Sequence, residues 1–511
     1  MEFFVNQLTS NSLIFVATSV VLLYFFVQQK FQYWKRRGIK SLPVTSIFGN
    51  FSDCIFARKP LRDFFRESCL FGKGEKMVGF YVLDKPFLIL RDPECIKDVL
   101  VRDFKNFSNR CWSPNKGDFI GEVNIFSVKN PAWKILRQKL SPTFTSSKLK
   151  NMFSLILETS DNLEKYLDNI ATSDNNNVVD VKEVCEKFTT DVIGLTMFGM
   201  KLNALDNPNA EFREEGKKHF ENTYKRYFSL MSLLFMPRIA KLLGVTFFDP
   251  DVPTFFKRVI REAMMERIKS KCKRNDLFDA FIEMRENYMD KNDEFHHYFQ
   301  DDGLIATGIV FFLGGFEPSA SMMYLTLYEL SKHPDIQSRL RQEILDALNE
   351  TGGKITYELV MSLQYLDMVS SEGLRKYPLL HFLDREAENN YTFTNTNITI
   401  DKGTPIIIPM SGIHMDPEYF PDPDIFDPER FSPENRKKII PYTYFPFGEG
   451  PRNCIGMRIG LVQAKVGLIQ ILSKYEVTTC KETPNPLTFD SYTIFTKSKQ
   501  NILLDFRKLK S

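Results

Sequence analysis

The sequence predicts a mainly α-helical fold with small β-sheets, built as one large domain behind an N-terminal transmembrane helix. Apolar residues recur at the period of an α-helix over much of the chain. The segments with this period are 131–171, 181–199, 209–245, 252–290, 299–332 and 335–350. The 511-residue chain also lacks a Ser/Gly-rich linker, a long run of one charge sign and an internal repeat. One large unit is therefore favoured over several domains.

Residues 1–29 are predicted to form an uncleaved membrane anchor. No charged residue occurs from Phe3 to Gln29, and the apolar part of this stretch reaches the roughly 20 residues that cross a bilayer. Cations follow at once, beginning with Lys30, so the positive-inside rule places residues 30–511 in the cytosol. A cleaved signal peptide would carry its cations before the apolar run and end at a small-residue site, and neither feature is present.

Short β-segments are predicted on both sides of the helical part. Residues 76–90 (KMVGFYVLDKPFLIL) are rich in β-branched and aromatic residues and indicate two strands around a turn at Asp84-Lys85. Residues 391–410 (YTFTNTNITIDKGTPIIIPM) indicate a second, smaller hairpin region.

Composition excludes some classes of protein. The 67 Lys and Arg nearly balance the 64 Asp and Glu, which argues against nucleic acid as a main partner. The 47 phenylalanines indicate a large apolar interior or pocket. The eight cysteines are widely spaced and form no CxxC pair, so neither a zinc site nor a disulfide framework is indicated.

One run near the C-terminus, FGEGPRNCIG from Phe447 to Gly456, indicates chemistry at Cys454. A thiolate that ligates a metal needs a rigidly held sulfur and backbone N–H groups directed at it. The surrounding glycines permit the tight backbone path that this arrangement requires. Arg452, two residues before the cysteine, offers a permanent forked cation that suits a carboxylate.

The pattern F-G-x-G-x-R-x-C-x-G resembles the haem-thiolate loop of the cytochrome P-450 family, and every position is filled. The resemblance extends from about residue 30 to the C-terminus, and the stretch WKILRQKLSPTFTSSKLKNMF is similar to the insect microsomal branch. It implies the cytochrome P-450 fold for a catalytic domain at 30–511 and haem b as the cofactor. It implies Cys454 as the axial iron ligand, with Phe447 and Gly456 in the haem-binding loop.

Further haem contacts follow from the same resemblance. Trp133 and Arg137 are four residues apart and share one helix face. An isolated pair of this kind would most simply be a packed tryptophan beside a solvated arginine. The resemblance instead implies that both, together with Arg385 and Arg452, bind the haem propionates.

Three charged residues are predicted to form a structural network beneath the haem site. Glu372 and Arg375 are three residues apart on a helix, a spacing that is common on exposed helices and carries little information alone. The resemblance implies that they meet Arg430, from the segment Pro428–Phe431 (PERF). The loss of one member of such a buried network is expected to be strongly destabilising.

The segment GGFEPS, from Gly314 to Ser319, is the main departure from the family pattern. The resemblance implies that it crosses the distal haem face, with Gly314 leaving room for dioxygen and Glu317 in the acid position of an acid–alcohol pair. The alcohol position, normally threonine, is Pro318. Proline frees the carbonyl of Gly314 to hold a water and is expected to kink the helix. Ser319 would supply a hydroxyl if the kink turns it inward.

The resemblance implies a membrane-anchored monooxygenase of the endoplasmic reticulum. One oxygen atom of O2 would enter a lipophilic small molecule, a xenobiotic being one candidate. Electrons would come from NADPH through NADPH–cytochrome P-450 reductase, with cytochrome b5 as an optional second donor, because the chain has no nucleotide-binding glycine loop. Pocket positions implied by analogy are Phe107, Ile120, Val310, Leu313, Leu380 and Phe495.

Two other functions stay open at this point. Because Pro318 replaces the usual threonine, the site could instead rearrange peroxides or dehydrate substrates. The third hypothesis is a non-catalytic haem-binding protein.

Overall fold

The computed structural model describes residues 15, 17–19, 29–44, 46, 48–112, 114–115, 117–173, 177–207, 210–219, 223–249, 251–274, 276–288, 294–394 and 396–509. The predicted anchor at 1–29 lies almost wholly outside the described residues. The few residues described before Gln29, namely Phe15 and 17–19, are helical and exposed.

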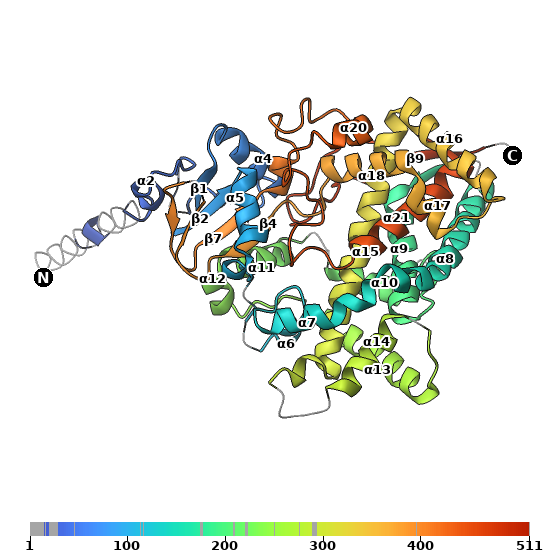
Figure 1. The fold of residues 1–511 in the computed structure, drawn as a ribbon, viewed down its shortest axis with the longest axis horizontal. Helices are drawn as coiled ribbons and strands as arrows, with labels where there is room; N and C mark the ends of the chain where they lie inside the picture. The colour runs from blue at the N-terminus through green and yellow to red at the C-terminus, as the bar shows by residue number, and fades with distance from the viewer. Residues whose placement is uncertain are drawn as a thin grey trace, which may run out of the picture.

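A four-stranded sheet lies at the end of the body nearest the N-terminus (Figure 1). Its strands are, in order, β1 (Met77–Val82), β2 (Lys85–Leu90), β7 (Pro405–Ile408) and β4 (Leu383–Glu386). β1 and β2 form the predicted antiparallel hairpin, in which Val82 pairs with Lys85, so the turn lies at Leu83-Asp84, one residue before the predicted Asp84-Lys85. β7 runs parallel to β2 and antiparallel to β4. This topology places Arg385, on β4, at the edge of the sheet that faces the helical part.

Two smaller sheets complete the strands that the described residues form. β3 (Val178–Asp180), β9 (Leu503–Lys508) and β8 (Tyr475–Thr479) pair in that order. β5 (Tyr391–Thr392) and β6 (Thr399–Ile400) form a short antiparallel pair. The predicted hairpin at 391–410 is therefore split, because only β5 and β6 pair with each other while the apolar run Pro405–Ile408 joins the larger sheet.

Helices form most of the remaining structure. Near the sheet lie α2 (Tyr33–Arg36), α3 (Ser52–Ile55), α4 (Leu61–Phe71), α5 (Pro93–Lys97) and α19 (Met410–Ile413). The rest are α6 (Phe119–Val123), α7 (Ala132–Leu140), α8 (Ser146–Ser173), α9 (Val181–Phe198), α10 (Glu211–His219), α11 (Tyr224–Phe235), α12 (Pro237–Leu242), α13 (Asp251–Ser270), α14 (Leu277–Asn287), α15 (Asp301–Lys332), α16 (Pro334–Glu350), α17 (Tyr357–Ser362), α18 (Gln364–Lys376), α20 (Pro433–Arg436) and α21 (Met457–Lys474).

Several predicted helices are divided in the structure. The predicted segment 131–171 is interrupted after α7 by a short 3-10 turn that contains Pro142. The predicted segment 209–245 is divided into α10, α11 and α12, and Pro237 occupies the first turn of α12. Proline fits the first turn of a helix but not its interior. A prediction from helical periodicity alone therefore gave one helix where proline begins a new one, at Pro142 and at Pro237.

The long helix α15 passes through the middle of the molecule, with α9 and α21 packed against it (Figure 1). Among the described residues it is the one helix long and apolar enough to cross a membrane. However, 78% of its most apolar stretch is buried inside the protein, which is the environment of a core helix. The helix is continuous from Asp301 to Lys332 through Pro318.

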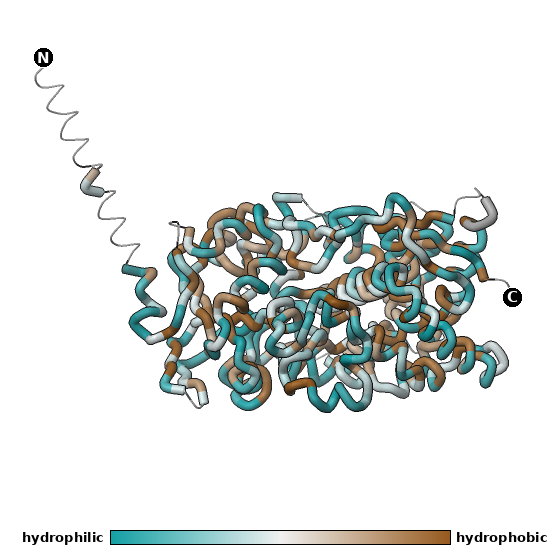
Figure 2. Tube along the Cα trace, turned by 90° about the horizontal axis from the view of Figure 1, so that it is seen from above, coloured by the Kyte–Doolittle hydropathy of each residue, from teal (hydrophilic) through white to brown (hydrophobic). Residues whose placement is uncertain are grey.

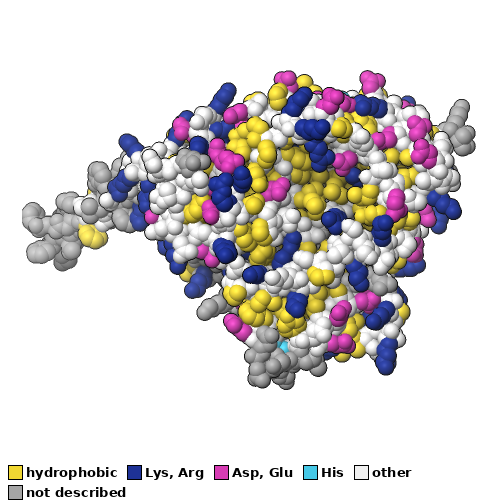
Figure 3. Space-filling view, viewed as in Figure 1, with side chains coloured by type: hydrophobic (Ala, Val, Ile, Leu, Met, Phe, Trp, Pro, Cys, Tyr) yellow, Lys and Arg dark blue, Asp and Glu magenta, His cyan; other side chains and the backbone are white. Residues whose placement is uncertain are grey.

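Apolar and polar segments alternate along the whole body (Figure 2), as expected for helices that bury one face. On the face shown in Figure 3, acidic and basic side chains are interspersed, and hydrophobic side chains gather in a hollow near the middle. Neither charge sign dominates that face.

Candidate active site

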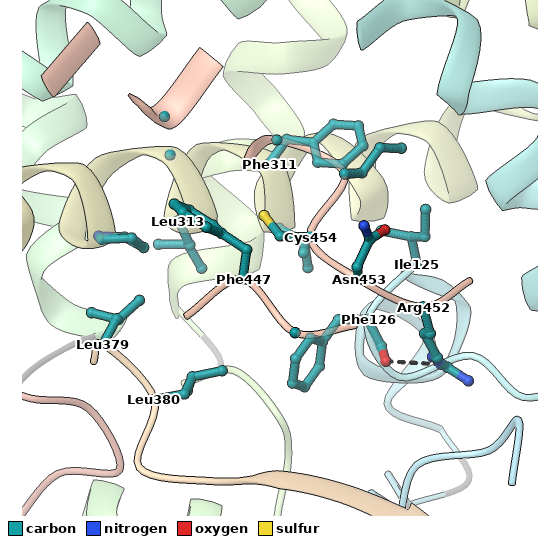
Figure 4. A pocket seen from close by; sticks show the side chains of 18 of the residues that line it. Ile125, Phe126, Phe311, Leu313, Leu379, Leu380, Phe447, Arg452, Asn453 and Cys454 are labelled. Carbon is teal, nitrogen blue, oxygen red and sulfur yellow. Dashed lines mark hydrogen bonds between the residues drawn. The ribbon is translucent and has the colours of Figure 1, made fainter. Parts of the chain in front are cut away.

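A cavity of about 340 Å³ lies between α15 and the loop that carries Cys454. Figure 4 shows the sulfur of Cys454 directed toward α15, with Phe447 on one side of it and Asn453 on the other. The loop continues directly into α21, whose first residue follows Gly456. The sheet supplies Leu383 and Arg385 to the wall of the same cavity, so both ends of the molecule contribute to it.

The path of the cysteine loop requires glycine at two positions. Gly448 and Gly450 have φ values of 73° and 74°, in the left-handed region that other residues rarely adopt. A Cβ at Gly450 would lie 2.9 Å from the carbonyl carbon of Leu100 and closer still to its oxygen. The loop is closed by the amide of Cys454, which donates to the carbonyl of Phe447 at 2.8 Å.

The thiol of Cys454 has a mixed electrostatic environment. Its side chain is open to the cavity, although protein encloses it on the other sides. Burial raises the pKa of the Cys454 thiol, whereas the backbone N–H of Gly456 and the guanidinium groups of Arg137 and Arg110 lower it. The N–H donor and both cations stabilise a thiolate, which is the ionisation state that ligates a metal.

A cluster of cations, all buried except the partly exposed Arg137, lines the cavity beside this loop. Its members are Arg110, Arg137, Arg385 and Arg452, and the indole of Trp133 lies among them. Arg452 donates to the carbonyls of Val128 at 2.8 Å and Phe126 at 3.1 Å (Figure 4). Its guanidinium carbon also lies 4.8 Å from the centre of the Trp133 ring.

The cation cluster holds more positive charge than its neighbours neutralise. Asp384 is the one carboxylate among the cavity-lining residues, and Arg110 pairs with it at 3.1 Å. The Nε atoms of Arg110, Arg385 and Arg452 are buried without a hydrogen-bond partner. Burial, and then the neighbouring arginines, lower the pKa of Arg385 to about 9 and that of Arg452 well below its usual value.

An anionic group placed among these arginines would remove both the excess positive charge and the unpaired N–H groups. It would supply acceptors for the orphaned N–H groups and would compensate the excess charge. The carboxylates of a haem would meet this requirement, with cavity-lining arginines such as Arg385 as the residues that could hold them. Both terminal nitrogens of Arg137 donate to Asn453, at 2.8 Å each. Those of Arg452 donate to the backbone carbonyls of Ser108, Phe126 and Val128, so the protein already engages both of these guanidinium groups.

The opposite wall of the cavity is formed by α15. Gly314, Pro318 and Ser319 line it, and a Cβ at Gly314 would have no heavy atom within 4 Å. The absence of a side chain at Gly314 therefore leaves open space on this wall. The hydroxyl of Ser319 accepts a hydrogen bond from Nε2 of Gln463, which comes from α21.

Glu317, predicted as the acid that serves the cavity, does not line it. Its carboxylate is buried, 2% of the residue is exposed, and Oε1 has no hydrogen-bond partner. Glu317 instead lies close enough to Glu186, on α9, to contribute to raising that pKa to about 7, after the larger effect of burial. The packing of α9 against α15 encloses the Glu317 side chain. Its position along the helix, which was the basis of the prediction, does not reveal this burial.

The three members of the predicted structural network meet in the structure. Arg375 donates to both carboxylate oxygens of Glu372, at 2.6 and 2.7 Å, and all of these side-chain atoms are buried. Arg430 approaches the same carboxylate at 3.6 Å, and the amide of Asp427 donates to it at 2.9 Å. Arg375 also donates to the carbonyls of His414 and Pro423, so the buried charge is well supplied with partners.

The predicted pocket positions divide into two groups. Val310, Leu313, Leu380 and Phe495 line the cavity. Phe107 and Ile120 do not: the ring of Phe107 packs edge-on against Tyr391 beside the sheet, and Ile120 lies in the core around α6. Phe107 belongs to a connecting segment and Ile120 to the five-residue helix α6, which is too short to show a periodic pattern in the sequence.

Two polar residues that line the cavity, Arg110 and Gln463, were not predicted from the sequence. Arg110 lies in an irregular segment without a helical or strand period, and no local signal marked it. Gln463 lies on α21 among apolar residues, and a buried glutamine at position i+9 from Cys454 was the one available hint. Further apolar walls come from side chains scattered over the chain, including Ile125, Phe126, Phe311 and Leu379 (Figure 4). Phe382 also lines the cavity.

Known proteins resemble this chain over nearly its whole length. The family model described as "Cytochrome P450" matches residues 40–506. Cytochrome P450 6k1 of Blattella germanica is 39% identical, with 98% of this chain and 97% of that protein aligned. Probable cytochrome P450 6g2 of Drosophila melanogaster is 40% identical over 96% of this chain and 97% of its own length. Cytochrome P450 6a2 of Drosophila melanogaster is 37% identical, with 94% of this chain and 96% of that protein aligned.

Proposed function

Because this chain belongs to the cytochrome P450 family of haem-thiolate monooxygenases, we propose that it inserts one oxygen atom of O2 into a lipophilic small molecule. The family assignment agrees with the predicted fold and with the predicted resemblance to insect members. It also removes the reason for considering a non-catalytic haem-binding protein. We propose haem b as the cofactor and NADPH as the source of electrons.

The observation that carries this proposal is the position of Cys454. Its sulfur faces an enclosed cavity, under a helix wall that glycine leaves open at Gly314. Burial raises the pKa of the Cys454 thiol, and the N–H of Gly456 and two arginines act against this shift by lowering it. Excess buried cations lie beside it, where a haem carboxylate would bind. A structural cysteine in a turn would need none of these features.

When bound, a haem would supply the iron at which dioxygen is activated, and the Cys454 thiolate would ligate that iron. The protein itself holds the sulfur, through the amide of Cys454 and the two positive-φ glycines. Arg385 and Arg452 would hold the haem carboxylates. The packed interior around the cavity excludes bulk water, which limits side reactions.

An apolar substrate is favoured by the walls of the cavity. Val310, Leu313, Leu380 and Phe495 contribute aliphatic and aromatic surface, and the charged groups gather on the opposite side, near Arg452. A ligand in this space gains free energy mainly from burial of apolar area and from a few oriented polar contacts. A xenobiotic would fit this chemistry, as would an endogenous lipid-like compound.

We also propose the membrane setting and the electron donors. Residues 1–29 would anchor the chain in the endoplasmic reticulum membrane, with residues 30–511 on the cytosolic side. Electrons would reach the site from NADPH–cytochrome P-450 reductase, and cytochrome b5 could act as a second donor. These proposals are supported by the uncharged apolar run before Lys30 and by the lack of a nucleotide-binding glycine motif in the sequence.

A second candidate function keeps one observation in its favour. Pro318 lines the cavity at the position where the family pattern has a threonine hydroxyl, so that hydroxyl is missing. An enzyme that rearranges hydroperoxides or dehydrates a substrate would not need it. The hydroxyl of Ser319, which lines the same cavity one residue later, favours oxygenation instead.

Two assays test the proposal. The reduced holoprotein with carbon monoxide should absorb near 450 nm, and Cys454→Ser should abolish this band. With reductase and NADPH, a panel of lipophilic compounds should give products heavier by one oxygen atom. Turnover of an added hydroperoxide without reductase, together with no NADPH-dependent product, would establish the second candidate and reject the first.

A further inference from the structure

We propose that Gln463 is a positioning residue that holds the hydroxyl of Ser319 with its proton directed into the cavity. The residue lies on α21, the helix that begins directly after the cysteine loop, and reaches across to α15 on the opposite wall. The inference rests on the proposed oxygenation function, because the oriented proton matters only if an oxygen acceptor occupies the cavity.

The two helices pass close to each other at this point. A Cβ at Gly460, on α21, would lie 3.6 Å from Oγ of Ser319. One turn further along α21, Gln463 is completely buried. Its Nε2 donates to the carbonyl of Gly315 at 3.0 Å and also to Oγ of Ser319. One amide group therefore bridges two residues of the cavity wall.

The orientation of this amide follows from its partners. A backbone carbonyl only accepts hydrogen bonds, so the group of Gln463 that faces Gly315 must be the NH2 and not the oxygen. The second hydrogen of the same NH2 then faces Ser319. Ser319 Oγ is consequently the acceptor in that contact, and its own hydrogen cannot be directed at Gln463.

The proton of Ser319 is left facing the cavity. No other hydrogen bond of this hydroxyl is formed among the described residues, and the side chain lines the cavity. Gln463 thus occupies the acceptor capacity of the hydroxyl and leaves its donor capacity for a molecule inside the cavity. A hydroxyl without such a partner would rotate among several orientations.

The bridge is retained at a cost to stability. Oε1 of Gln463 is buried without a hydrogen-bond partner, whereas an apolar side chain at this position would leave no unpaired group. The other buried polar side chains of α21, Lys465 and Gln470, pair with carboxylates away from the cavity, so the unpaired amide oxygen of Gln463 is better explained by orientation of Ser319 than by folding.

The arrangement compensates for Pro318. Proline has no hydroxyl, and it lacks the N–H that would bond the carbonyl of Gly314 in the helix. Gly314, Pro318 and Ser319 all line the cavity. A water molecule there could accept from Ser319 and donate to the freed carbonyl of Gly314, which gives it the two polar partners that an ordered water needs. The hydrogen-bond donor would then be shifted by one residue along the helix instead of being lost.

The test removes the bridge with little change of shape. Gln463→Met keeps an unbranched side chain of similar length but cannot hydrogen-bond. The matched control is Gln470→Met, on the same helix, which removes a buried glutamine that donates to Glu164 away from the cavity. Ser319→Ala removes the hydroxyl itself, and Ser321→Ala, whose hydroxyl donates to Tyr324, is its control.

The first readout is the infrared C–O stretch of the carbon monoxide complex of the reduced holoprotein. A hydrogen bond donated to the bound gas lowers this frequency. Ser319→Ala should therefore raise it, Gln463→Met should raise or broaden it, and both controls should leave it unchanged. A second variant, Gln463→Glu, offers a carboxylate acceptor that draws the Ser319 proton away from the cavity, and should resemble Ser319→Ala.

The second readout is the fraction of NADPH oxidation that yields product. Gln463→Met should lower this fraction about fivefold, the factor that corresponds to one hydrogen bond of average strength. In the Ser319→Ala background the same substitution should have no further effect, because Gln463 acts only through that hydroxyl. An equal effect of Gln463→Met with and without Ser319, or an unshifted C–O stretch in Ser319→Ala, would overturn the inference.

The outcomes separate this inference from the proposed function. If the wild-type protein shows the 450 nm band and the C–O shifts but oxidises no substrate with reductase, the geometric inference stands and the proposed function fails. If the wild-type protein oxidises substrates and the shifts are absent, the proposed function stands and the role of Gln463 is rejected.

Discussion

Gly450→Ala is expected to damage the cysteine loop far more than Gly448→Ala, although the two glycines are two residues apart and have nearly the same φ. A Cβ at Gly448 has only side-chain atoms of Leu383 and the Cα of Asn453 near it, the closest at 3.6 Å. A Cβ at Gly450 meets the backbone of Leu100 at less than 3 Å. The pair therefore separates backbone conformation from steric overlap.

The two costs can be estimated from these distances. A left-handed backbone costs a residue with a Cβ about 1–2 kcal/mol, and this applies to both variants. At Gly448 the contact of 3.6 Å is ordinary packing, so nothing is added. At Gly450 the neighbour is backbone and cannot rotate away, which adds about 1–3 kcal/mol for forced movement. Gly450→Ala should thus cost about 2 kcal/mol more than Gly448→Ala.

The assay compares the midpoints of urea unfolding for the two variants and the wild type, with equal slopes required before the midpoints are converted to free energy. The 450 nm band of the reduced carbon monoxide complex is recorded in parallel. Because displacement of Leu100 must move the loop, Gly450→Ala should also lose part of this band to a species absorbing at shorter wavelength.

Equal midpoints for the two variants would refute the steric reasoning, since φ is shared and only the space differs. A Gly448→Ala variant less stable than Gly450→Ala would refute it more strongly. Retention of the full 450 nm band in a destabilised Gly450→Ala protein would show that Leu100 moves while the loop stays in place.

Other residues lead to further predictions. Glu372→Gln should cost about 3–5 kcal/mol in urea unfolding, because it leaves Arg375 buried without its carboxylate, whereas Glu67→Gln, which breaks the exposed pair with Lys59, should cost less than about 1 kcal/mol. Burial and Glu317 raise the pKa of Glu186 from 4.5 to about 7, so the folded state binds more protons than the unfolded state in this range. Stability should accordingly fall as pH rises from about 4.5 to 7, by up to about 3 kcal/mol, and pH-dependent unfolding of Glu186→Gln should lack this slope. Removal of haem should leave the buried arginines without their anion. Added phosphate should then raise the melting temperature of the haem-free wild type more than that of haem-free Arg385→Gln. Equal increases would contradict an anion site at Arg385.

The sequence predicted those parts of the site whose chemistry lies in consecutive residues. In the cysteine loop, the glycines, Arg452 and Cys454 share one short segment, and the constraints on each are local. The Glu372–Arg375 pair is local too, since three residues on a helix bring the side chains together. Its contact with Arg430 came from the family resemblance, because no local spacing connects residues so far apart.

The site residues that were predicted wrongly or not at all are those whose positions depend on contacts between helices or strands. Whether Glu317 faces the cavity or α9 is decided by how two helices pack, and periodicity assigns a face without saying what covers it. Gln463 meets Ser319 only because α21 crosses α15 closely at Gly460. Phe107 lies in a connecting segment and Ile120 in the short helix α6, where side-chain direction follows from tertiary structure and not from a repeating pattern.

The burial of α15 has a consequence for synthesis of the protein at a membrane. By length and composition this helix could itself be inserted into a bilayer, and only its neighbours make it a core helix. α9 precedes it in the chain and α21 follows it by more than a hundred residues. During translation, α15 therefore emerges when α9, the helix with which it has its most extensive contact, already exists and α21 does not. Early docking onto α9 would keep α15 out of the bilayer, so substitutions on the α9 face that contacts α15 should alter topology before they alter catalysis.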